Sequence, residues 1–78
     1  MEKAFVFINV ETGSENEVLR RLRDVPEVKE AYFVYGVYDI VAKVETDSLA
    51  HLKEVISTKV RTLNNIKSTL KTIVMEGK

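Results

Sequence analysis

Residues 35–39, with the sequence Tyr-Gly-Val-Tyr-Asp, combine a turn-forming glycine with a carboxylate. A turn presents backbone N–H groups that can bind a carboxylate, and Asp39 can bind an ammonium group. Together these groups would form a receptor for a zwitterion. A purely structural interpretation is also open, in which Gly36 adopts a positive φ and Tyr35 pairs with Tyr38 across two strands. That interpretation leaves Asp39 unexplained, because aspartate is a poor strand former.

No other group of residues predicts catalysis, a metal site or a cofactor. His51 is the only histidine, its helical phase places it toward solvent, and no serine or cysteine nucleophile pattern accompanies it. One histidine without cysteine gives no metal-ligand spacing, and the three isolated glycines form no phosphate-binding loop. Aromatic side chains could stack on RNA bases, but residues 38–45 lack the RNA-recognition signature.

The length and composition predict one small globular domain that covers residues 1–78. The chain is 45% apolar and 31% charged, with 12 basic and 12 acidic residues. A net charge of zero argues against direct DNA binding and against an anionic membrane surface. The longest apolar runs are too short to cross a membrane, and cysteine is absent, so we expect a cytoplasmic protein.

Four strands and two helices are predicted to alternate in the order βαββαβ. Pro26 ends the first helix near Asp24, and the second helix follows the N-cap candidates Asp47 and Ser48. Gly36 and Val37 alone are expected to join the two middle strands as a tight hairpin. The predicted strands cover residues 4–10, 28–35, 38–45 and 66–75, and the predicted helices cover residues 14–24 and 49–63.

This order predicts an α+β fold, the ferredoxin-like sandwich, with a four-stranded antiparallel sheet. Right-handed crossovers would place both helices on one face of the sheet. The other face would then carry large apolar side chains without cover from the chain itself. We therefore expect a homodimer that packs sheet on sheet.

Residues 26–56, "PEVKEAYFVYGVYDIVAKVETDSLAHLKEVI", resemble the effector-binding domain of Lrp/AsnC regulators, called RAM. The family phrase Gly-x-Tyr/Phe-Asp corresponds to Gly36 through Asp39, and its later ending corresponds to residues 60–74. The resemblance covers essentially the whole chain. Asn65 replaces a usual glycine, and Lys71 replaces a frequent threonine. Because the helix-turn-helix domain of full-length members is absent from this sequence, we expect a stand-alone form.

The resemblance implies an amino-acid effector pocket between neighbouring dimers. It implies dimers that assemble further, with an octamer of four dimers as the expected particle, and co-assembly with full-length Lrp/AsnC regulators. Two other functions stay open: a small dimeric α+β barrel enzyme, and an assembly module without a ligand. The implied effector-binding residues are Gly36, Val37, Tyr38, Asp39, Thr69 and Lys71, with Ser68 and Leu49 as additional candidates.

Overall fold

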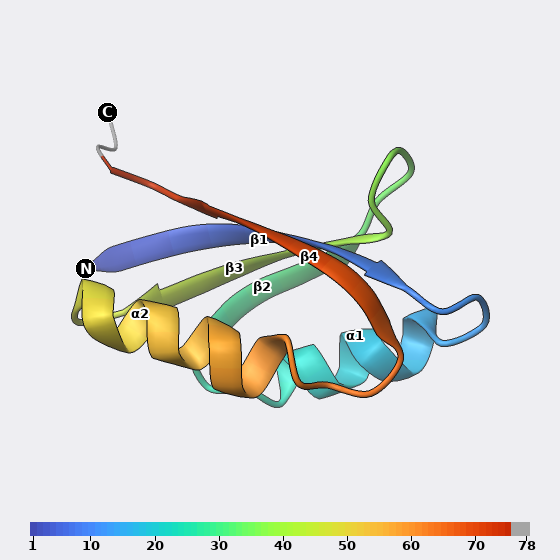
Figure 1. The fold of residues 1–78 in the computed structure, drawn as a ribbon, viewed down its shortest axis with the longest axis horizontal. Coiled ribbons are helices and arrows are strands. Elements are labelled where there is room, and N and C mark those ends of the chain that lie inside the picture. The colour runs from blue at the N-terminus through green and yellow to red at the C-terminus, as the bar shows by residue number, and fades with distance from the viewer. Residues whose placement is uncertain (76–78) are drawn as a thin grey trace.

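The computed structural model describes residues 1–75 and confirms the ferredoxin-like prediction. The four strands form one antiparallel sheet in the order β2-β3-β1-β4. Both helices lie on one face of this sheet, and the other face is open (Figure 1). The elements are β1 (Glu2–Val10), α1 (Glu15–Arg23), β2 (Val28–Phe33), β3 (Ile40–Thr46), α2 (Leu49–Val55), the π-helical turn η1 (Ile56–Val60) and β4 (Ile66–Ile73).

The core lies between the sheet and the helices. Alternate residues of β1 point toward the helices, since side chains in a strand alternate between its two faces. Val6 and Ile8 are fully buried there, beneath Leu22 of α1 and Leu52 of α2. No helix among residues 1–75 is long and apolar enough to cross a membrane.

Both helices begin where the sequence predicts. Ser48 is the N-cap of α2, and its hydroxyl accepts a hydrogen bond from the His51 N–H at 3.1 Å. Ser14 is the N-cap position of α1, although its side chain makes no capping bond. The α1 helix ends at Arg23, as the position of Pro26 predicts.

The second helix departs from the prediction of one continuous α-helix over residues 49–63. After Val55 the chain makes the π-helical turn η1, in which the Arg61 N–H donates to the Ile56 carbonyl at 2.9 Å. The hydroxyl of Thr58 bonds the Glu54 carbonyl at 2.7 Å, a local bond that competes with regular helical pairing. The turn before β4 contains Asn65 at a φ of 69°, a left-handed conformation that asparagine tolerates in place of the glycine usual in the family.

The prediction of a two-residue hairpin between the middle strands is wrong. Residues 34–39 lie outside both strands, and the Val34 N–H bonds the Asp39 carbonyl at 3.0 Å where the loop closes. Gly36 does not adopt a positive φ. Both common two-residue turns need a positive φ at their first central residue, and because Gly36 does not supply it a longer loop joins the two strands.

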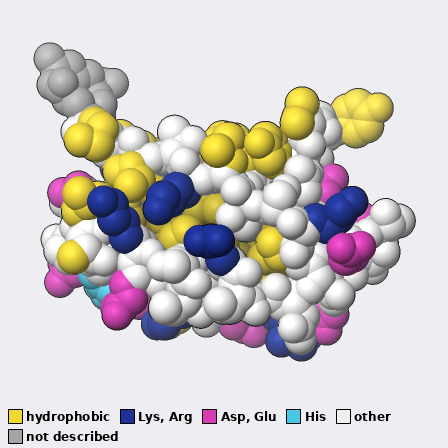
Figure 2. Space-filling model, viewed as in Figure 1, with side chains coloured by type: hydrophobic (Ala, Val, Ile, Leu, Met, Phe, Trp, Pro, Cys, Tyr) yellow, Lys and Arg dark blue, Asp and Glu magenta, His cyan; other side chains and the backbone are white. Residues whose placement is uncertain are grey.

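The open face of the sheet carries the large apolar side chains that the sequence predicts. Phe7 pairs with Val41 of β3 and Leu70 of β4, so these three side chains lie together on this face. Leu70 is half exposed. Figure 2 shows hydrophobic side chains along the upper edge of the molecule, where this face is seen from the side. One chain therefore leaves a substantial apolar surface uncovered.

Candidate functional site

The loop of residues 34–39 projects beyond the sheet (Figure 1). Tyr35 and Val37 near its tip are 107% and 85% exposed, so neither side chain packs on its own chain. A side chain added at Gly36 would meet open space. The tip therefore has the properties of a contact surface for another molecule rather than those of a packed turn.

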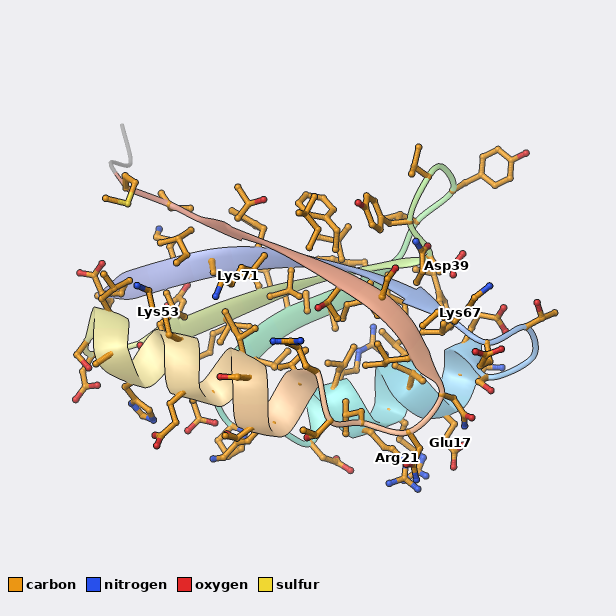
Figure 3. The ribbon with its side chains drawn as sticks, viewed as in Figure 1. Glu17, Arg21, Asp39, Lys53, Lys67 and Lys71 are labelled. Carbon is orange, nitrogen blue, oxygen red and sulfur yellow. The ribbon has the colours of Figure 1, made fainter. Side chains whose placement is uncertain are left out.

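Asp39 stands at the base of this loop, beside the end of β1 (Figure 3). Its Oδ2 accepts a hydrogen bond from the Val10 N–H at 3.0 Å, and its own N–H donates to the Ile8 carbonyl at 3.0 Å. Within residues 1–75, Asp39 Oδ1 has no hydrogen-bond partner. The carboxylate is thus fixed by one oxygen, and its other oxygen can accept a bond from a ligand.

Tyr38 lies over the open face of the sheet instead of beginning β3. Its ring is tilted against Phe7, with the ring centroids 5.6 Å apart. Ser68 also reaches this face, where Asn9 Nδ2 donates to the Ser68 hydroxyl at 3.3 Å. These residues lie on the opposite side of the sheet from the helices.

Thr69 and Lys71 lie on the helix-covered side of β4. They pair with Ile8 and Val6 of β1, whose side chains point into the core, and paired residues share a face. A groove of about 640 Å³ runs between β4 and the end of the second helix. Figure 2 shows Lys and Arg side chains bordering a hydrophobic strip on this face. The groove is lined by Ile56, Arg61, Ile66, Lys67, Ser68, Thr69, Leu70 and Lys71.

A β-bulge shapes one end of this groove. Asn9 pairs with Ser68, but the next residue, Val10, pairs with Ile66, which leaves Lys67 as an extra residue in β4. Such a bulge bends the strand and redirects the extra side chain. The bulge therefore keeps Ile66 against the core while Lys67 lines the groove.

The predicted site residues do not form one pocket within a single chain. None of the loop residues lines the groove, and Leu49 lies at the start of α2 with 37% exposure. Sequence reasoning missed Ile56, Arg61, Ile66 and Lys67. The sequence pattern indicates only core positions for Ile56 and Ile66. The positions of Arg61 and Lys67 depend on the π-helical turn and the bulge.

His51 belongs to a surface ion-pair cluster, and its side chain is 40% exposed. Its Nδ1 lies 3.2 Å from Asp47 Oδ1, and this hydrogen bond lowers the pKa of Asp47. Its Nε2 lies 3.6 Å from Glu27, whose pKa is lowered by its own backbone N–H and then by Lys59. No group of three acidic or histidine side chains within residues 1–75 could hold a metal ion. The cluster joins α2 to the segment before β2.

Comparison with known proteins places this fold among transcriptional regulators and their relatives. The family model described as "Lrp/AsnC ligand binding domain" matches residues 3–77. Regulatory protein AsnC of Haemophilus influenzae is 36% identical over 74 residues, which are 94% of this chain and 49% of that protein. The chain thus spans about half the length of this regulator.

Two further matches extend the comparison. The crystal structure of FFRP-DM1 superimposes with a TM-score of 0.92 at 44% identity, over 96% of this chain and all of that one. A segment of homocitrate synthase from Sulfurisphaera tokodaii is 37% identical over 59 residues, which are 76% of this chain but 13% of that protein. The similarity to this enzyme is therefore confined to a small part of its length.

Proposed function

The chain belongs to the Lrp/AsnC ligand-binding domain family, and from this premise we propose that it binds a free amino acid as an effector. The observation that carries the proposal is the separation of two complementary surfaces. The loop at residues 34–39 presents an apolar tip and a fixed carboxylate, while β4 presents an open groove with hydroxyl and ammonium groups. Because one chain cannot join these surfaces, the complete site lies where neighbouring copies meet.

The assembly that we propose uses two different contacts. The open sheet face, with Phe7, Val41 and Leu70, packs on the same face of a second copy and forms a dimer. The projecting loop then contacts the β4 groove of a neighbouring dimer. Repetition of this second contact around a ring would give the octamer that the family resemblance implies.

Each part of a zwitterion has a partner in this arrangement. The ligand ammonium pairs with the free Oδ1 of Asp39. The ligand α-carboxylate binds the hydroxyl of Thr69 and the ammonium of Lys71. The apolar part of the ligand meets Val37 from the loop and Ile56 from the groove. Ligand binding would therefore stabilise the contact between dimers.

We propose that the ligand-stabilised contact between dimers is the means by which the effector regulates transcription. The same open face and loop would let the chain assemble with full-length Lrp/AsnC regulators and change their activity on DNA. The similar segment in homocitrate synthase favours a second possibility, in which such a domain modulates an enzyme. In both roles, the binding of an amino acid is the signal that changes the activity of the partner.

A thermal-shift screen of the proteinogenic amino acids tests the proposal. A ligand at 100 times its Kd should raise the free energy of unfolding by about 2.7 kcal/mol. The best ligand is then titrated by calorimetry into wild type, Asp39→Asn and the control Asp24→Asn. Asn at position 39 keeps an oxygen for the Val10 N–H and removes the charge, so its effect on binding is separated from misfolding.

We expect Asp39→Asn to weaken binding about ten-fold or more, because the ammonium loses its charged partner. Asp24→Asn should bind like wild type, since Asp24 follows α1 and is exposed. Unchanged affinity in Asp39→Asn would remove Asp39 from the site. Failure of every amino acid to bind at about 10 mM would leave a pure assembly module as the function.

A further inference from the structure

The β4 groove contains more positive charge than a simple zwitterion requires. Arg61, Lys67 and Lys71 line it, and no acidic residue does. Among the residues that the structure describes, none of these three has a carboxylate oxygen within 4.0 Å. Several other described cations, such as Lys29 and Lys53, also lack an ion pair, so the distinguishing feature is that three cations line one groove. The chain as a whole has no net charge, so this concentration of cations is a local feature.

The fold holds these cations in place around an apolar floor. The pairing of Lys71 with the buried Val6 fixes it on the helix side of β4. The bulge directs Lys67 into the other end of the groove, and the π-helical turn places Arg61 opposite β4. Ile56 and Ile66 supply apolar lining of the same groove. Figure 3 also shows Lys53 projecting from α2 on the same side of the molecule as Lys71.

The volume and the lining both suit a small anionic ligand. About 640 Å³ lies within the range of small-molecule sites, which combine apolar walls with a few polar groups. Arg61, Lys67 and Lys71 are exposed, so water screens their mutual repulsion, and a bound anion would offset it further. A guanidinium such as that of Arg61 binds a carboxylate through two parallel hydrogen bonds.

We infer that the effector carries a second carboxylate on its side chain, as glutamate and aspartate do. The inference rests on the proposed function, since it assigns the chemical class of the amino acid that this site takes. Thr69 and Lys71 bind the α-carboxylate, and Arg61 and Lys67 bind the side-chain carboxylate. A neutral amino acid would leave these last two cations without a partner.

Matched pairs of ligands test the inference on the wild-type protein. L-Glutamate is compared with L-glutamine, and L-aspartate with L-asparagine, by calorimetric titration at constant salt. Each pair has nearly the same shape and differs in the side-chain charge. In one pair, we expect the acid to bind with an affinity at least about ten-fold higher than that of its amide.

Three variants test the separate roles of the cations. Arg61→Gln and Lys67→Gln should reduce the preference for the acid over its amide, because they remove partners of the side-chain carboxylate. Lys71→Gln should weaken both ligands to a similar degree, because both have an α-carboxylate. Lys29→Gln is the matched control: Lys29 is exposed on the opposite edge strand β2, where it bonds the Pro26 carbonyl, and its loss should change neither affinity.

The possible outcomes separate this inference from the proposed function. Amides that bind as well as the acids would overturn the second carboxylate and leave the amino-acid sensor intact. Equal binding of 2-oxoglutarate and glutamate would support the second carboxylate and contradict the Asp39–ammonium contact of the proposed function. Inorganic phosphate that binds as tightly, with the same response to the variants, would overturn the inference in favour of a general anion site. Failure of every compound at about 10 mM would refute both.

Discussion

The hydrogen bond between Asp39 and β1 should contribute measurably to the stability of the fold. The Val10 residue that donates it is 4% exposed, so water can hardly replace the carboxylate after a truncation. A buried donor left without an acceptor costs about 1–3 kcal/mol. We therefore expect Asp39→Ala to lower the free energy of unfolding by about 2 kcal/mol. Asp39→Asn keeps an acceptor oxygen and should lose less than about 1 kcal/mol.

Urea unfolding followed by circular dichroism measures this difference. With a urea dependence of about 1 kcal/mol per molar for a small domain, Asp39→Ala should move the midpoint down by about 2 M. All variants must be compared at one protein concentration, because assembly stabilises the folded chain. If Asp39→Ala and Asp39→Asn unfold at the same midpoint, the Val10 bond is not the reason for the loss. A midpoint equal to that of wild type in Asp39→Ala would refute the structural role of this carboxylate altogether.

Three further predictions concern assembly, DNA and pH. Light scattering should give at least a dimer at micromolar concentration, whereas a uniform mass near 8.9 kDa would contradict packing through the open sheet face. The isolated chain should not shift random duplex DNA in a low-salt gel, because its net charge is zero; a salt-sensitive shift would show that the local cations suffice. The pKa of Glu30 is lowered by the Tyr32 hydroxyl and then by Lys43, and the pKa values of Glu27 and Asp47 are also lowered. Their stabilisation is complete above the ordinary carboxyl range, about pH 4 to 4.5, and is lost as pH falls through the lowered folded values. The urea midpoint of wild type should therefore be lower at about pH 3 than at about pH 6. The difference between the two midpoints should be smaller in Glu30→Gln than in wild type.

The regular elements of this chain could be predicted because periodicity and local chemistry agree. A short run of aromatic and β-branched residues predicted β1, Ser48 predicted the start of α2, and Pro26 predicted the end of α1. Asn65, which stands where the family usually has glycine, has a φ of 69°, which asparagine tolerates. In each case the decisive interaction lies within a few residues along the chain.

The candidate site was less predictable because its geometry depends on distant pairing. Gly36 indicates a two-residue turn, but it does not adopt the positive φ of such a turn, and the loop closes instead through the hydrogen bond from the Val34 N–H to the Asp39 carbonyl. The direction of Lys67 depends on a bulge opposite β1, and bulges leave no reliable local pattern. Thr69 and Lys71 were proposed from family resemblance, but their helix-side placement follows from pairing with Ile8 and Val6.

The π-helical turn η1 allows the second helix to contain one extra residue without changing the direction of the residues that follow it. Each α-helical residue turns the chain by about 100°, so one residue more or less reorients everything that follows. A π-helical turn takes up one additional residue within an otherwise α-helical segment. Deleting Thr58 would therefore allow regular i to i−4 bonding and leave Arg61 close to its present direction beside β4. A second residue deleted from the same segment would have no wide turn to absorb it and would rotate Arg61 by about 100°, away from the groove.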